Sequence, residues 1–204
     1  VIAAGMFVQA AAAAEFEPRV GQEGKDVIWV PTPQVLVDNM LDMAKVTPQD
    51  FVIDLGSGDG RTVITAAKRG ARAIGIEYNP DMVEVSKRNA AKEGVVDKTH
   101  FVKADLFESD FSKATVITMF LLTDINLKLR PTILNLKPGT RIVSNGFDMD
   151  TWEPDRTIRL AEQKGIDLLL QALPVLLEHP AQVVMLGSGD AAYETAIAAL
   201  ADAH

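Results

Sequence analysis

A glycine-rich run with two acids, Asp54-Leu-Gly-Ser-Gly-Asp-Gly60, is the part of this chain best suited to hold a small ligand. It follows the apolar residues from Phe51, and Thr62–Lys68 after it is small, apolar and compatible with a helix. Gly56, Gly58 and Gly60 allow positive φ and a close approach of the backbone to a ligand. The two carboxylates, Asp54 and Asp59, disfavour a pyrophosphate and favour a ligand that offers an ammonium group or hydroxyls.

Two further acids end later β-like runs. Glu77 ends Arg72–Glu77, about twenty residues after the glycine loop, where an acid is well placed to accept both ribose hydroxyls. Asp105 falls at the end of His100–Leu106, one strand further out, where an adenine amino group could be met. With Asp54, these acids describe a site for an adenosine that carries an amino acid in place of phosphates.

Two other nucleotide sites fit the loop less well. A dinucleotide fingerprint has glycines spaced G-x-G-x-x-G, but Arg61 stands at the third glycine's place. A P-loop is excluded because no Gly-Lys-Ser/Thr occurs in the loop. An ordinary strand-to-helix turn is the simple alternative for the glycines alone, and the three acids at strand ends favour a binding site over it.

The elements that would position these residues alternate between strand and helix. The sequence predicts strands starting at Phe51 and over 72–77, 100–106, 114–120 and 140–147. Helices are predicted after the elbow Trp29–Pro33 up to Thr47-Pro48, over 62–68, from Pro80 with Asn79 as N-cap to about Glu93, and over 124–136 with a kink or break at Pro131. This order predicts an α/β fold whose parallel sheet has helices on both faces and its ligand at the carboxyl ends of the strands.

Composition narrows the function classes. The 204 residues are 48% hydrophobic, enough for a large core, and Arg19–Lys25 has the glycines and charges of a linker. A formal net charge of -8 argues against a nucleic-acid substrate, because no basic surplus replaces the counterions. No cysteine is present and the three histidines are scattered, so we expect no metal site.

These motifs resemble the class I S-adenosylmethionine-dependent methyltransferases over about residues 26–155. Asp54–Gly60 is similar to their first motif, Glu77 to the ribose-binding acid and Asp105 to the adenine-proximal acid. Narrower matches are Val30-Pro-Thr-Pro33, Gly58-Asp-Gly-Arg61, Leu129-Arg-Pro131, Pro138-Gly-Thr-Arg141, Ser144-Asn145 and Trp152-Glu-Pro-Asp155. They resemble small prokaryotic relatives of the lysine methyltransferases that act on the ATP synthase c subunit.

The resemblance implies a Rossmann-like, doubly wound sheet, S-adenosylmethionine as cofactor and a set of site residues. The implied cofactor residues are Thr32, Asp54, Gly56, Ser57, Gly58, Asp59, Glu77, Tyr78, Asp105, Leu106 and Phe120. Met119–Leu122 should line the methyl-transfer side, and the candidates for the acceptor side are Phe120, Asn145, Phe147, Asp148 and Trp152. Packing in the core is the plain alternative for each aromatic residue, and a helix cap is the alternative for Thr32.

The end of the chain departs from that family, which normally finishes with a paired sixth and seventh strand. Gln163–Leu169 and Val184–Asp190, with Tyr193-Glu194, resemble part of the nucleotide-sugar domain of bacterial glycogen or starch synthases, in which Arg159 and Lys164 match phosphate-contacting positions. We expect three parts: an apolar segment and linker (1–25), a methyltransferase-like domain (26–155) and a tail (156–204). The chain reads as a chimera, and the β-α-β-α tail is expected to complete the edge of the same sheet.

An S-adenosylmethionine-dependent methyltransferase, acting on a protein lysine or another acceptor, is the leading hypothesis. A cofactor-binding protein without turnover and a nucleotide-sugar-binding fragment are the alternatives. The cofactor favours the cytoplasm or a membrane-proximal cytoplasmic place. The apolar stretch Val1–Ala14 is either a signal remnant or an N-terminal helix, so export or membrane association is the alternative. The sequence defines neither the acceptor nor the oligomeric state.

Overall fold

A computed structural model describes residues 15–158 of the chain. The chain divides into two compact units, Val1–Asp155 and Arg156–His204, and the fold below is that of the first. Most of the expectations for the tail, and those for Val1–Ala14, lie outside the described residues. Residues 156–158, where the sequence predicts the start of a tail strand, form no strand.

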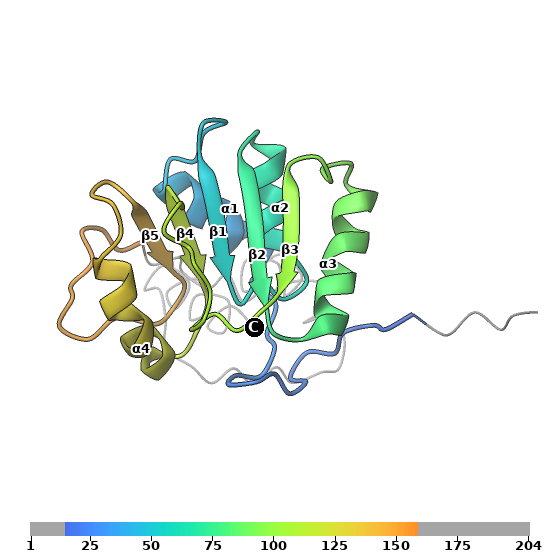
Figure 1. Ribbon diagram of the computed structural model, residues 1–204, viewed down its shortest axis with the longest axis horizontal. Coiled ribbons are helices and arrows are strands. Elements are labelled where there is room, and N and C mark those ends of the chain that lie inside the picture. The colour runs from blue at the N-terminus through green and yellow to red at the C-terminus, as the bar shows by residue number, and fades with distance from the viewer. Residues whose placement is uncertain (1–14, 159–204) are drawn as a thin grey trace, which may run out of the picture. The chain divides into compact units, whose positions relative to one another are not determined.

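The centre of the fold is a parallel sheet of five strands in the order β3-β2-β1-β4-β5 (Figure 1). The strands are β1 (Phe51–Leu55), β2 (Arg72–Glu77), β3 (Thr99–Lys103), β4 (Val116–Met119) and β5 (Arg141–Ser144). The five predicted strands and their parallel pairing are confirmed. The predicted ranges of β3, β4 and β5 were too long, because the apolar pattern continues into the loops that follow them.

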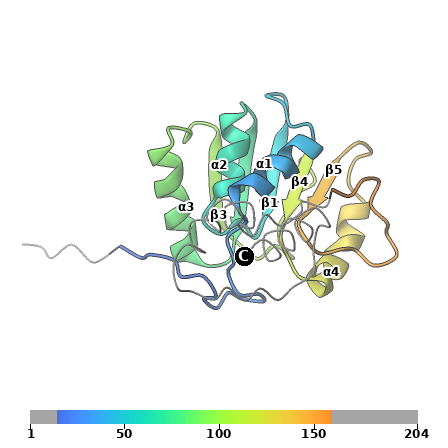
Figure 2. The same cartoon turned by 180° about the vertical axis from the view of Figure 1, so that it is seen from behind.

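Helices cover both faces of this sheet. The helices α1 (Gln34–Met43), α2 (Arg61–Lys68) and α3 (Pro80–Lys92) lie on one face, and α4 (Thr123–Leu134) lies on the other (Figures 1 and 2). Alternating strand side chains explain the two layers: Val52 belongs to the core under α1–α3, and its neighbour Ile53 to the core under α4. The predicted doubly wound arrangement is therefore confirmed.

The end of α1 and the interior of α4 differ from the prediction. The first helix stops at Met43, before Thr47-Pro48, because Lys45 adopts a φ of 49° and the Val46 N–H bonds back to the carbonyl of Leu41. Of the kink or break predicted at Pro131, the break is wrong, since α4 continues through it to Leu134, and the kink stays a prediction. The start of α3 is as predicted: the Asn79 side chain accepts hydrogen bonds from the N–H groups of Asp81 and Met82, with Pro80 as first residue.

A hydrogen-bonded network closes the amino-terminal end of β1. Asp50 accepts hydrogen bonds from the Thr47 N–H at 2.8 Å and the Thr115 hydroxyl at 2.7 Å, and it forms an ion pair with Arg141. Burial alone would raise the pKa of Asp50, but the hydrogen bonds from Thr115 and Thr47 and the charge of Arg141 together lower it. This end of the sheet is electrostatically satisfied, in contrast to the opposite end.

Candidate cofactor site

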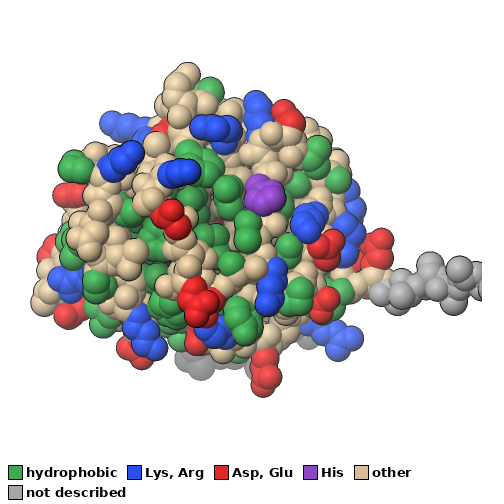
Figure 3. All heavy atoms as spheres, in the orientation of Figure 1, with side chains coloured by type: hydrophobic (Ala, Val, Ile, Leu, Met, Phe, Trp, Pro, Cys, Tyr) green, Lys and Arg blue, Asp and Glu red, His purple; other side chains and the backbone are tan. Residues whose placement is uncertain are grey.

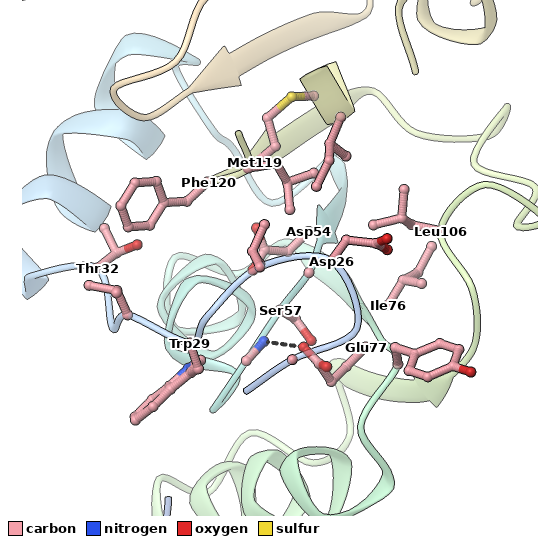
Figure 4. A pocket seen from close by; sticks show the side chains of 18 of the residues that line it. Asp26, Trp29, Thr32, Asp54, Ser57, Ile76, Glu77, Leu106, Met119 and Phe120 are labelled. Carbon is pink, nitrogen blue, oxygen red and sulfur yellow. Dashed lines mark hydrogen bonds between the residues drawn. The ribbon is translucent and has the colours of Figure 1, made fainter. Parts of the chain in front are cut away.

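A pocket of about 320 Å³ opens at the carboxyl ends of β1, β2 and β4 and the loop after β3 (Figure 4). Parallel α/β sheets bind ligands at this edge, where the strand order reverses about the first strand. The pocket brings together the predicted residues Asp54, Glu77, Asp105, Leu106 and Tyr78. The glycine loop, Thr32, Phe120 and Phe147 also line it.

The glycine loop has the backbone that the sequence predicts. Gly56, Gly58 and Gly60 have φ values of 76°, 54° and 82°, which disfavour residues with a side chain. At Gly58 space is limiting too, because an added Cβ would lie 2.6 Å from Nε1 of Trp29. Trp29 therefore packs directly on the loop and forms part of the pocket wall (Figure 4).

Two side chains of α3 and a glycine of β2 hold the glycine loop in place on the side away from the pocket. The buried hydroxyl of Ser86 donates to the carbonyl of Gly58 at 2.8 Å, and the Asn89 amide donates to the carbonyl of Asp59 at 3.0 Å. A Cβ at Gly75 would lie 2.4 Å from the Ser57 hydroxyl oxygen, so Gly75 makes room for that side chain. These contacts were not predicted, because no local pattern marks them.

Glu77 and Asp105 are both held by donors from the chain. The Glu77 carboxylate accepts hydrogen bonds from the N–H groups of Gly58 and Asn79, each at 2.9 Å (Figure 4 shows the first). Asp105 accepts from the Phe107 N–H at 3.0 Å and from Nζ of Lys25 at 2.5 Å. These hydrogen bonds orient the two carboxylates, whose remaining lone pairs can accept from hydroxyl or amino groups of a ligand.

Asp54 is the buried acid of the site, with 6% of its surface exposed. Its carboxylate accepts a hydrogen bond of 2.5 Å from the Thr118 hydroxyl. Burial raises the pKa of Asp54 to about 7, and the negative charges of Glu77 and Asp59 add to the rise, while Thr118 and Thr62 oppose it. A positively charged group of a ligand would supply the counter-charge that this carboxylate lacks.

Asp59 has a different partner from the one the sequence suggests. Arg61 forms a bidentate ion pair with it, Nε to Oδ1 at 2.9 Å and a terminal nitrogen to Oδ2 at 2.6 Å. The same guanidinium donates to the carbonyl of Thr32 at 2.7 Å and thereby connects the loop to the elbow before α1. Asp59 lines the pocket, but its carboxylate is paired with Arg61 of the same loop.

Residues 21–29 form a hairpin over the pocket, although the sequence indicated a linker at Arg19–Lys25. Glu23 and Ile28 form an antiparallel bridge, and Trp29 exchanges backbone hydrogen bonds with Gly21 and Gln22. Gly24–Thr32 lines one side of the pocket. The run shows little apolar alternation, so the sequence does not mark it as a hairpin. Its role follows from its position beside the glycine loop in the folded chain.

The acceptor-side candidates separate into two groups. Phe120 and Phe147 line the pocket and stack on each other, with ring centroids 5.9 Å apart. Asn145, Asp148 and Trp152 do not form part of the pocket wall. Trp152 packs against the core under α4, and the loop that carries Asp148 is turned toward that helix because the buried Asn126 amide donates to the carbonyls of Phe147 and Asp148.

Ser57 and Thr32, two of the predicted cofactor residues, also line the pocket. The Ser57 hydroxyl is buried in the pocket wall and has no hydrogen-bond partner among the described residues. Thr32 is 8% exposed and lines the pocket, and it is not the cap of α1, since Pro33 occupies the N-cap and no side chain caps the helix. Thr32 therefore lines the pocket and does not serve as a helix cap.

The residues present fit S-adenosylmethionine. The cationic residues among the described pocket lining, Lys25 and Arg61, are each paired with an aspartate, so the free charge of the site is negative. A phosphate would be repelled, whereas an ammonium group near Asp54 and hydroxyls near Glu77 would be attracted. The chemistry of the donor set agrees with an adenosyl amino acid.

Comparison with known proteins identifies the family. A profile described as the ANTKMT methyltransferase domain matches residues 54–156, half of the chain. A protein-lysine N-methyltransferase of Saccharolobus islandicus is 45% identical over 139 residues, which are 67% of this chain and 86% of that protein. The chain belongs to this methyltransferase family. It is an S-adenosylmethionine-dependent enzyme, as its motifs implied.

Other relatives of this methyltransferase differ in the acceptor that their names give. The lysine N-methyltransferase of the ATP synthase c subunit from Xenopus laevis is 35% identical over 62% of this chain, and the match spans only 56% of that longer protein. A crystal structure of an RNA methyltransferase from Salinibacter ruber with S-adenosyl-L-homocysteine is 52% identical, with a TM-score of 0.63 over 64% of this chain and 87% of that one. Both names describe methyltransferases.

A short stretch of the methyltransferase chain has a separate similarity. The glycogen synthase of Anaeromyxobacter dehalogenans is 67% identical over 46 residues, which are 22% of this chain and only 10% of that protein. The resemblance seen in the sequence is therefore confirmed as a short partial match, while the chimeric origin and the packing of the tail stay predictions. Within residues 15–158 no helix is long and apolar enough to cross a membrane.

Proposed function

We propose that this methyltransferase transfers a methyl group to the ε-amino group of a lysine in a protein. The observation that carries the proposal is the uncharged wall beyond Asp54, built from Met119, Phe120, Leu121, Leu122, Ile125 and Phe147. A lysine side chain is an apolar stem with a compact cationic end. The stem suits the aliphatic residues, and aromatic faces such as Phe120 and Phe147 attract the ammonium group.

The cofactor supplies a methyl group on a sulfonium, which moves from sulfur to the lysine nitrogen. The chain's own residues then have three tasks. Glu77 and Asp105 would hold the ribose hydroxyls and the adenine amino group, and Asp54 with Thr32 would face the methionine end. The apolar wall would desolvate the ammonium, which lowers its pKa so that it releases a proton to water before the neutral amine attacks the methyl group. Asp59 would stabilise the glycine loop through its ion pair with Arg61.

RNA is the competing acceptor, because the Salinibacter ruber structure is described as an RNA methyltransferase. Two features of this chain argue for the protein substrate. Lys25 and Arg61 at the pocket are bound to Asp105 and Asp59, so they do not offer free charge to a phosphate backbone. The net charge of -8 also opposes binding to a polyanion. We place the reaction in the cytoplasm, where the cofactor is made.

The test offers both acceptors to the full chain with methyl-labelled S-adenosylmethionine. We expect label in lysine-containing peptides and in a mixed protein extract, no label in peptides with arginine at the same positions, and none in total RNA. Glu77→Ala should abolish cofactor binding in calorimetry and the labelling with it. Label in RNA but not in protein would overturn the lysine assignment and leave the cofactor site intact.

A further inference from the structure

The hairpin of residues 21–29 and the residues 30–32 that follow it, together called the lid hairpin here, cover the end of the pocket where we place the adenine. Its backbone closes on itself through hydrogen bonds between Trp29 and both Gly21 and Gln22. Figure 4 shows Asp26, Trp29 and Thr32 of this segment around the same space as Asp54 and Glu77. A ligand held between the lid hairpin and the strand ends would lie against this segment.

Lys25, at the tip of the lid hairpin, reaches across to two loops on the far side of the pocket. Its Nζ lies 2.5 Å from Oδ2 of Asp105, 5.1 Å from the centroid of the Tyr78 ring and 5.8 Å from that of Phe107. Tyr78 follows β2, and Asp105 and Phe107 follow β3. A carboxylate with two aromatic rings is an arrangement that binds an ammonium group well.

The same two rings are exposed, so their position needs an explanation other than core packing. Tyr78 is 45% exposed and Phe107 is 39% exposed. Each ring also lies near a second lysine. Nζ of Lys103 is 5.4 Å from the centroid of the Tyr78 ring, and Nζ of Lys128 is 5.9 Å from that of Phe107. The row Lys103–Tyr78–Lys25–Phe107–Lys128 thus alternates cations and rings, with Lys25 at its centre.

We propose that Lys25 is a latch that holds the lid hairpin over the adenine end and sets the rate at which S-adenosylmethionine and S-adenosylhomocysteine leave. The latch joins a segment before α1 to the loops after β2 and β3, so that its release opens the pocket without disturbing the sheet. The hydrogen bond with Asp105 raises the pKa of Lys25 and, reciprocally, lowers that of Asp105, which keeps the pair charged around neutral pH.

Lys25 positions the lid hairpin, and the exposure of its ion pair with Asp105 to solvent limits the energy of that contact. The Lys25 and Asp105 side chains are 34% and 20% exposed, so salt screens the ion pair in part. Loss of an exposed ion pair and two cation–π contacts should raise the dissociation rate of the bound cofactor product by roughly tenfold to thirtyfold. The expected effect is on release of the bound product, and it should shrink as ionic strength rises.

The experiment loads the full chain with radiolabelled S-adenosylhomocysteine, adds excess unlabelled ligand and follows the loss of label. Lys25→Met keeps the length of the side chain and removes its charge; it should release the product roughly ten times faster at low salt. Its rate should depend on salt less than that of the parent chain. Lys25→Arg should restore slow release, and Lys113→Met, at an exposed lysine outside the pocket, should match the parent.

A second variant protects the test against a folding defect. Phe107→Leu removes one ring of the latch from an exposed residue that does not line the pocket, and it should speed release by roughly twofold to fivefold. Thermal unfolding without ligand identifies any variant that fails to fold. Release at the parental rate by a folded Lys25→Met or Phe107→Leu protein would overturn the proposal, as would an equal salt dependence in Lys25→Met. None of these outcomes depends on which acceptor is methylated.

Discussion

The buried Asp54 should destabilise the ligand-free enzyme above mildly acidic pH, and Asp54→Asn should remove that cost. Folding raises the pKa of this carboxyl from 3.8 to about 7. Stability from such a group is fully present below pH 3.8 and is lost as the pH rises through 7, because the unfolded chain releases its proton earlier. At 1.36 kcal/mol per pH unit, the loss reaches about 1.7 kcal/mol at pH 5 and about 4 kcal/mol at pH 8.

Asparagine is a suitable replacement because it keeps the size of the side chain and an oxygen that can accept from the Thr118 hydroxyl. We therefore expect urea unfolding of Asp54→Asn, measured without ligand, to show a gain of about 4 kcal/mol over the parent at pH 8 and less than half of that at pH 5. Calorimetry at pH 8 should show weaker binding of S-adenosylmethionine, whose ammonium group loses its counter-charge.

The control is Asp97→Asn, at an exposed aspartate in the turn before β3, which should change stability little at either pH. A gain for Asp54→Asn that is the same at pH 5 and pH 8 would mean that the effect is not titration of this carboxyl. A loss of stability at pH 8 would refute the reasoning altogether, because it would show that the buried charge has a favourable partner in the folded chain.

Two further predictions concern the contacts that fix the glycine loop. Ser86→Ala leaves the buried carbonyl of Gly58 without its hydrogen-bond donor. We expect the free energy of unfolding in urea to fall by about 1–2 kcal/mol and calorimetry to show weaker binding of S-adenosylmethionine. Unchanged values for both quantities would contradict this role. Gly75→Ala places a Cβ 2.4 Å from the Ser57 hydroxyl oxygen. It should weaken the binding of S-adenosylmethionine by roughly tenfold or more, because the overpacked loop must shift. Ser57→Gly in the same chain should restore part of that loss, and an undiminished affinity in Gly75→Ala alone would refute the steric argument.

The sheet and the acids of the site could be predicted because their causes are local. Apolar runs that end in a turn or an acid are visible along the chain, and the parallel arrangement then brings Asp54, Glu77 and Asp105 to one edge. The positive φ of the three glycines follows from residue type and position. The start of α3 followed in the same way from Asn79 and Pro80.

The features that escaped prediction depend on partners distant in the sequence or on how a side chain folds back. Lys25 meets Asp105 across 80 positions, so a charged run with glycines could only be interpreted as a linker. The sequence presents Asp59 as a ligand contact, whereas Arg61, two residues away, folds back on it. Trp152 is aromatic and follows β5, yet whether such a residue lines a pocket or the core depends on the turn that carries it.

Hydrophobic side chains are visible on the sheet face that bears α4 (Figure 3), and several residues packed against that core, such as Ile74 and Ile142, are only partly buried. This face includes the alternate side chains of the same strands whose other side is covered by α1–α3. The sequence predicted helices on both faces but not this difference between them, because periodicity gives the faces of a strand and not the number of helices available to cover each.

The strand order divides the enzyme into two parts that are each continuous in the chain. The acids proposed to hold the cofactor lie within residues 51–105, on β1, β2 and the loop after β3, whereas the wall proposed for the acceptor comes mainly from β4, α4 and the loop after β5. The acceptor wall can thus change by substitution or exchange of one later stretch of the gene, while the residues around the adenosine keep their sequence. An architecture of this kind allows related enzymes to share a cofactor and to diverge in what they methylate.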